Sequence, residues 1–95
     1  MDPVVSLLSD LVAIPSMNPM GRGRTGPEYS EQSLADFVRA FLTKNSIDSE
    51  LQQVLPGRPN VLGHVDAHAS QTIILEAHLD TVHADSMTIE PFTPV

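Results

Sequence analysis

Hydrophobic residues recur at helical spacing close to the N-terminus. The set comprises Val4, Val5, Leu7, Leu8, Leu11 and Val12. Asp2 is a favourable N-cap residue, and Pro3 suits the first position of a helix. Pro15 disfavours a helical conformation in the residue before it, so the helix must end there. The pattern predicts a helix over about residues 3–13, with its apolar stripe in the core.

A second apolar stripe follows after a loop at residues 15–27, which is rich in proline and glycine. It consists of Leu34, Phe37, Val38, Phe41 and Leu42. Thr25 and Glu28 have the spacing of a capping box, and Pro27 suits the first turn. We therefore predict a helix over about residues 27–44, ended by Asn45 in the left-handed conformation. Both phenylalanines lie on the stripe and are predicted to be core residues.

The pattern then changes to extended segments. Residues 47–55 weakly resemble a strand, Pro56–Pro59 is a loop, and residues 60–65 are a second predicted strand. The third, 72–77, begins with the apolar, β-branched run Thr72–Leu75, which is typical of a strand buried on both faces. The short turn at 67–70 favours an antiparallel hairpin between the second and third strands.

This order of elements predicts an α/β fold: two N-terminal helices followed by β-strands of a mixed sheet. With 95 residues the chain holds one domain at most, and its core would be small. The C-terminal segment, residues 87–95, carries two prolines and is predicted to be extended.

Composition excludes several classes of function. The net charge is −7, with 12 acidic residues against five Lys and Arg, which argues against binding to nucleic acid or to anionic membrane surfaces. The chain has no cysteine, so a metal would have to be bound by His and carboxylate side chains. No secretory signal or membrane-spanning window is visible, which predicts a cytoplasmic protein.

His78 and Asp80 are the strongest candidates for chemistry. They follow the predicted strand and are two residues apart, so in an extended chain their side chains point to the same side, roughly 6.5 Å apart. Ligands of open α/β sheets bind at such strand ends. An imidazole that can bind a metal, oriented by a nearby carboxylate, is one interpretation; a structural pair that satisfies its own hydrogen bonds is the other.

The remaining histidines are weaker candidates. His64 and Asp66 repeat the same spacing but are interpreted as a surface or edge pair, and His68 as an exposed turn residue. His83 and Asp85 could join the central pair in a local site made of nitrogen and oxygen ligands. That arrangement would require a tight loop, because all four ligands would come from a short stretch. Arg22 and Arg24 are interpreted as solvated loop charges.

Several segments in order resemble the zinc-dependent aminoacylases and deacylases of peptidase family M20. Leu11–Pro19 is similar to the start of these enzymes, and Asn60–Val61 to their second strand. Ala77–Val82 resembles their first metal motif, and Glu90–Phe92 the proline-phenylalanine pair that follows it. His83 and Met87 depart from the family pattern, where a proline and an aromatic residue are common.

The resemblance implies that His78 binds one zinc of a two-metal centre and that the catalytic residue Asp80 orients its imidazole. Such a centre activates a water that attacks an amide carbonyl. The substrate would be an N-acyl amino acid, as for acetylornithine deacetylase, or a peptide; cobalt or manganese in place of zinc, and a homodimeric full-length enzyme, stay open.

Residues 1–95 would then be the N-terminal part of a larger α/β zinc-peptidase catalytic domain. The family's other metal ligands and its general base lie further along the chain than Val95, so we expect the isolated chain to be inactive. The alternative from the residues alone is a small, non-catalytic α/β module that binds a partner through an uncovered strand edge or helix face.

Overall fold

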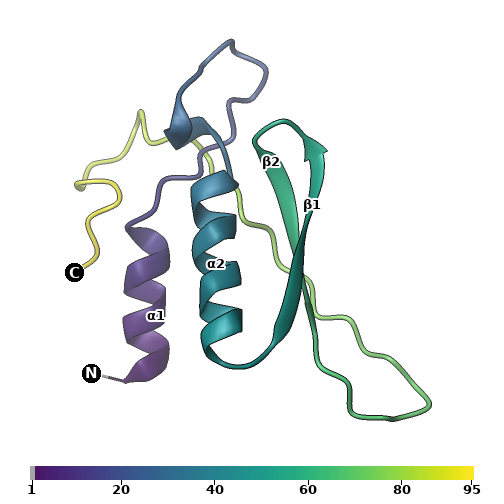
Figure 1. Cartoon of the computed structure of the whole chain (residues 1–95). Coiled ribbons are helices and arrows are strands. Elements are labelled where there is room, and N and C mark those ends of the chain that lie inside the picture. The colour runs from purple at the N-terminus through teal and green to yellow at the C-terminus, as the bar shows by residue number, and fades with distance from the viewer. Residues whose placement is uncertain (1) are drawn as a thin grey trace.

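The computed structural model describes residues 2–95 and contains two α-helices beside a two-stranded sheet. Helix α1 spans Pro3–Val12, helix α2 spans Gln32–Lys44, and a short 3₁₀ helix, η1, covers Pro27–Tyr29. Figure 1 shows α2 against the hairpin of the two strands, with α1 on the side of α2 away from that hairpin. The chain is therefore a small α/β fold.

Helix α1 begins as the sequence predicts. The carboxylate of Asp2 accepts a hydrogen bond from the backbone N–H of Val4 at 2.8 Å, and Pro3 occupies the first turn. The prediction that its apolar stripe is core is wrong, because the helix has no buried residue. Val4 remains 74% exposed and Leu8 58%. Within the described part of the chain, Leu7 and Leu11 are half-buried, and the rest of the apolar face of α1 is exposed.

The predicted helix over 27–44 is divided into two. Ser30 is extended (φ −137°, ψ 147°), and its hydroxyl accepts from the N–H of Gln32, so α2 starts only after it. The predicted capping box is absent, since Gly26 precedes η1 without a side-chain cap. At the other end Asn45 has φ −97° and is not left-handed; Ser46, with φ 60°, makes that turn instead.

The core lies where α2 meets the hairpin and the loop before η1. The buried hydrophobic residues of the described chain are Met17, Leu34 and Ala35. Phe41 is 36% exposed, so its assignment to the core was wrong. Such a small core is in keeping with the chain's length.

Strand β1, Asp48–Leu55, pairs antiparallel with β2, Arg58–His64, across the turn at residues 56–57. The register places Asp48 opposite His64 and Leu51 opposite Val61. Gly57 has φ 73°, a left-handed conformation that glycine adopts without steric cost. Both predicted strands are thus confirmed, with β2 beginning two residues earlier than predicted.

The predicted third strand, residues 72–77, is wrong. These residues belong to no strand, and Ile73, Ile74 and Leu75 are 84%, 84% and 94% exposed. Segment 65–80 instead forms a loop that extends beyond the hairpin and returns past α2 (Figure 1). A buried strand needs neighbours on both edges and faces, and no described residue supplies them.

The predicted hairpin between 60–65 and 72–77 is consequently also wrong. The observed sheet is antiparallel. Among the described residues, the only parallel pairing of backbone segments is an isolated β-bridge between Met17 and Thr81. A mixed sheet within a larger domain therefore stays a prediction. No helix in residues 2–95 combines the length and the apolar character needed to cross a bilayer.

Candidate functional site

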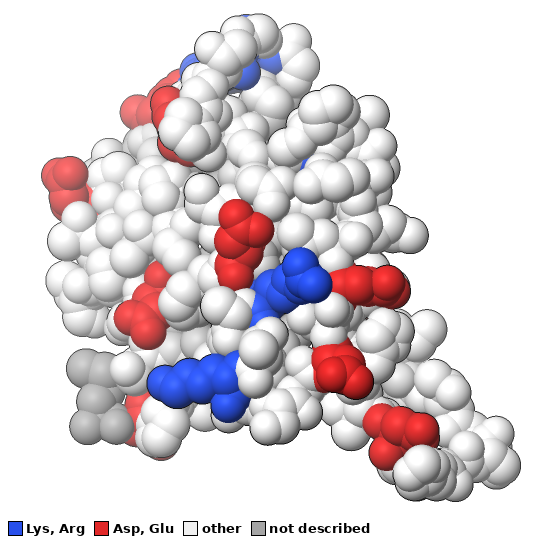
Figure 2. Space-filling view, in the orientation of Figure 1, with Lys and Arg blue, Asp and Glu red and all other residues white. Residues whose placement is uncertain are grey.

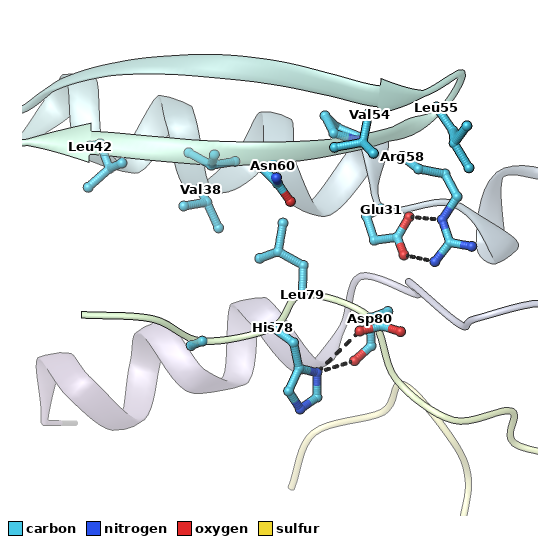
Figure 3. Close-up of a pocket in the computed structure, with 13 residues that line it drawn as sticks. Glu31, Val38, Leu42, Val54, Leu55, Arg58, Asn60, His78, Leu79 and Asp80 are labelled. Atoms are coloured by element: carbon cyan, nitrogen blue, oxygen red, sulfur yellow. Dashed lines mark hydrogen bonds and ion pairs between the residues drawn. The ribbon is translucent and has the colours of Figure 1, made fainter. Parts of the chain in front are cut away.

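His78 and Asp80 lie together, as their spacing predicts. The Nδ1 atom of His78 is 2.8 Å from the main-chain oxygen of Asp80 and 3.3 Å from its carboxylate Oδ1. Figure 3 shows Leu79, the residue between them, pointing the other way, toward the hairpin. The alternation of an extended chain thus puts the imidazole and the carboxylate on one side.

The contacts of His78 fix the position of its ring proton. A carbonyl oxygen can only accept a hydrogen bond, so the nitrogen that faces it, Nδ1, must carry the hydrogen. In the neutral ring, Nε2 then keeps its lone pair. The side chain is 85% exposed, so this nitrogen is open to a ligand. Metal-binding histidines commonly have their second nitrogen hydrogen-bonded in this way.

Asp80 is held more firmly than His78. Its Oδ2 accepts a hydrogen bond of 2.8 Å from the side-chain amide of Asn18, and 33% of its side chain is exposed. The pKa of Asp80 lies below its ordinary value, mainly because of the Asn18 hydrogen bond and further because of His78, although partial burial opposes the shift. The carboxylate is therefore ionised near neutral pH and available to the imidazole.

Residues 16–18, which we call the latch, connect this pair to the N-terminal half of the chain. The buried Ser16 donates its hydroxyl hydrogen to the carbonyl oxygen of Leu79 at 2.8 Å. The backbone N–H of Thr81 donates to the Ser16 oxygen at 3.0 Å, and that of Asn18 to the Thr81 oxygen at 2.8 Å. Two segments more than 60 positions apart thus pair like short parallel strands.

A cleft of about 550 Å³ lies between the hairpin and segment 77–80. Its lining is largely apolar, with the polar residues Glu31, Arg58, Asn60, His78 and Asp80 among those that border it. The imidazole of His78 itself points away from the hairpin, on the opposite side of the chain from Leu79 (Figure 3). Figure 3 shows Leu79 facing the cleft opposite Val38 and Asn60, while Arg58 and Glu31 lie near one end. Such a mixture of apolar walls and few polar groups is typical of small-molecule sites.

Glu31 and Arg58 form a bidentate ion pair at this end of the cleft. The Nε atom of Arg58 donates to one carboxylate oxygen at 2.9 Å, and its NH2 group donates to the other. The Glu31 side chain is only 8% exposed and that of Arg58 31%. Glu31 holds the pKa of Arg58 above its ordinary value. The pair joins the start of α2 to the start of β2.

The proposed four-residue cluster with His83 and Asp85 does not form. Asp85 is occupied by Arg24, whose two terminal nitrogens donate to its two carboxylate oxygens. The pKa of Asp85 is lowered chiefly by this contact. Within residues 2–95, no group of three or more His, Cys, Asp or Glu side chains could hold a metal ion. The interpretation of Arg24 as a solvated loop charge is therefore wrong, because Arg24 is paired with Asp85.

The other two histidines lie at the surface, as predicted. His64 is 61% exposed, and its Nε2 is 3.5 Å from Glu50 on the neighbouring strand, so its partner is not the predicted Asp66. His68 is 87% exposed, and its Nδ1 lies 3.5 Å from Asp66. Neither histidine adjoins the cleft.

Figure 2 shows the charge distribution on one face of the molecule. Acidic side chains are spread across it, with only a few basic ones between them, and these do not gather into a patch. This face offers no basic surface of the kind that binds a phosphate backbone. The absence of nucleic-acid and membrane partners stays a prediction.

Comparison with known proteins gives no assignment. No protein-family model matches the chain, and no curated protein and no solved structure matches it. The site must therefore be interpreted from its own geometry, and the resemblance to family M20 stays a prediction.

Ser16 and Asn18 are the site residues that the sequence did not indicate. Asn18 precedes a proline in a loop, a setting that suggests a turn, and it does form one by accepting the N–H of Met20 at 2.8 Å. Its second contact, with Asp80, spans 62 positions. Hydrophobic periodicity carries no information about such a contact.

Proposed function

We propose that residues 1–95 are the N-terminal part of the catalytic domain of a zinc-dependent amidohydrolase or exopeptidase. The substrate would be an N-acyl amino acid, as for acetylornithine deacetylase, or the C-terminal bond of a peptide. One observation carries the proposal: the imidazole of His78 is held through Nδ1 beside an ionised carboxylate, and its Nε2 is free and exposed.

The residues present fit zinc as one part of a metal centre. A neutral imidazole nitrogen is a ligand that zinc favours, and Asp80 would orient it. When bound, zinc would supply an activated water for attack on an amide carbonyl. His78 is the only ligand that we assign in this chain, so the others would come from residues beyond it.

The exposed apolar surface supports a place in a larger domain. Small single domains rarely leave large apolar surfaces or strand edges open. This chain exposes the side chains of residues 73–75, most of the apolar face of α1 and an edge of β2. In the larger mixed sheet that we propose, segment 72–77 would gain the neighbours that a buried strand requires.

The first test is a titration of the chain with zinc, followed by NMR of the histidine rings. We expect His78 to respond at lower zinc concentrations than His68, which has a similar acidic neighbour and exposure and so serves as the internal control. His78→Ala should remove the early response, whereas His83→Ala should leave it unchanged. An equal response of the exposed histidines would contradict the proposal.

The second test is activity. A reading frame that continues beyond Val95 should encode further ligands and hydrolyse N-acetyl amino acids, and His78→Ala should abolish turnover. The isolated chain should be inactive, because one ligand cannot hold a catalytic metal pair. Tight stoichiometric zinc together with turnover by residues 1–95 would overturn this.

The same exposed surfaces favour one alternative function, a non-catalytic module that binds a protein partner. Analytical ultracentrifugation distinguishes the two. A folded, soluble monomer that shows no preferential zinc response at His78 would support the module, whereas self-association together with that response would support the enzyme fragment.

A further inference from the structure

We propose that Asn18 is a positioning residue that sets the tautomer of His78 by orienting Asp80. The inference rests on the proposed metal-binding role of His78, but its direct measurement does not require a metal. The observation behind it is that the imidazole of His78 is 85% exposed, so apart from its contacts with Asp80 little restrains the ring.

Two oxygens of Asp80 face Nδ1 of His78, and the latch contacts the groups that carry both of them. The first is the carbonyl oxygen of Asp80. That carbonyl belongs to the same planar peptide unit as the N–H of Thr81, which donates to the oxygen of Ser16 at 3.0 Å. The latch therefore sets the direction in which the carbonyl points toward Nδ1.

The second oxygen is Oδ1 of the Asp80 carboxylate, which makes an ion-pair contact with the ring. Asn18 donates to Oδ2 at 2.8 Å, which leaves Oδ1 directed at the imidazole, 3.3 Å from Nδ1. Without the amide donor the carboxylate could rotate about its last bond and turn Oδ1 away. The exposed ring would then keep only the contact with the Asp80 carbonyl, and we expect this contact alone to leave a mixture of the two tautomers, in one of which Nε2 carries the hydrogen.

Asn18 is itself held from both sides. Its side-chain oxygen accepts the N–H of Met20 at 2.8 Å, and its backbone N–H donates to Thr81. The amide orientation follows from these contacts, because the oxygen must face the Met20 donor and the NH₂ group must face the Asp80 acceptor. A rigid donor of this kind can direct the carboxylate, whereas a mobile one could not.

Asn18→Asp is the most informative variant. It keeps an oxygen for the N–H of Met20 and so preserves the local turn, but it replaces the donor to Asp80 with a second carboxylate oxygen. Gln53→Glu is the matched control, because it adds the same charge and breaks an exposed amide hydrogen bond, to Gln32, without touching Asp80. Circular dichroism at 222 nm verifies that both variants are folded.

The readout is the pair of ring-nitrogen chemical shifts of His78 in ¹⁵N-edited NMR, recorded without metal at pH 8, where an ordinary imidazole is neutral. We expect the Nδ1–H form to dominate in the wild type and in Gln53→Glu, and a mixture in Asn18→Asp. The double variant Asn18→Asp, Asp80→Asn reverses donor and acceptor, and should return the ring to the Nδ1–H form.

Zinc affinity gives the second readout. Loss of a residue that orients a metal-binding histidine typically weakens the metal by about 10- to 100-fold, so the zinc response of His78 in Asn18→Asp should move to at least about tenfold higher concentration. An unchanged tautomer and zinc response in folded Asn18→Asp would overturn the inference and leave the proposed function standing. If Asn18→Asp shifts the tautomer but His78 of the wild type shows no preferential zinc response, the positioning role of Asn18 is supported and the proposed metal-binding role of His78 is wrong.

Discussion

The ion pair between Glu31 and Arg58 makes a prediction whose direction follows from unequal burial. Arg58→Met keeps most of the side chain's apolar stem but leaves the carboxylate of Glu31, 8% exposed, without its partner. Glu31→Gln removes the opposite charge, yet the guanidinium of Arg58 is 31% exposed and can turn to water. The loss of the arginine should therefore cost more than the loss of the acid.

The magnitudes follow from the same geometry. Breaking a fully buried ion pair costs about 3–5 kcal/mol, and hydrogen bonds to charged groups contribute about 1.5–3 kcal/mol. Because Arg58 is partly exposed, the loss of stability should fall below that of a fully buried pair. We expect a decrease in the free energy of unfolding of about 2–3 kcal/mol for Arg58→Met and about 1 kcal/mol for Glu31→Gln. In a domain of this size, 1 kcal/mol shifts Tm by about 4–8 °C.

Urea unfolding followed by circular dichroism at 222 nm measures both differences. The double variant Glu31→Leu, Arg58→Met leaves no unpaired charge and should be more stable than Arg58→Met alone. Arg24→Met is the surface control, because the acid that it leaves unpaired, Asp85, is 49% exposed against 8% for Glu31, so stability should change far less. Equal losses for Arg58→Met and Glu31→Gln, or a double variant less stable than both, would refute the reasoning.

Two further predictions concern the exposed segment and the pH dependence of folding. Ile74→Asp should change the free energy of unfolding by less than about 0.5 kcal/mol, whereas Leu34→Ala should cost about 2 kcal/mol or more, as urea unfolding of each variant would show. The pKa of Asp80 is lower in the folded chain than in the unfolded chain, where it has its ordinary value of about 3.9. The resulting stabilisation is fully present above the unfolded pKa and is lost as the pH falls through the folded pKa. Unfolding measured between pH 6 and pH 2 should therefore show a smaller acid-induced loss in Asn18→Ala than in the wild type.

Residue type and spacing correctly predicted those secondary-structure elements whose formation depends on neighbouring residues. The N-cap at Asp2 and both strands of the observed hairpin lie where residue type and spacing put them. The same signals failed where a choice depended on distant partners. Helix α1 is amphipathic, yet the described chain buries none of the residues of its apolar stripe. Periodicity indicates which face is apolar but not whether a partner exists.

The break between η1 and α2 illustrates a second limit. The pattern over 27–44 is continuous, but Ser30 is extended and donates its hydroxyl hydrogen to the carbonyl oxygen of Gly57 in the hairpin turn. This side-chain contact spans 27 positions, so the partner that holds Ser30 against the hairpin lies outside the local pattern. The nearby pair of Glu31 and Arg58 joins the same two regions. The start of α2 thus combines a local bond, from the N–H of Gln32 to the Ser30 hydroxyl, with tertiary contacts that the apolar pattern does not encode.

The proximity of His78 and Asp80 was predicted correctly, but for the wrong physical reason. From the sequence, His78 and Asp80 were expected on one side because they would follow the end of a buried strand. That strand is absent, and the exposed run before the site cannot orient anything. The extended conformation of residues 79–81 comes instead from pairing with the latch, which supplies both backbone and side-chain hydrogen bonds. The orientation of the imidazole therefore depends on loop residues 16–18 and not on a strand that precedes the site.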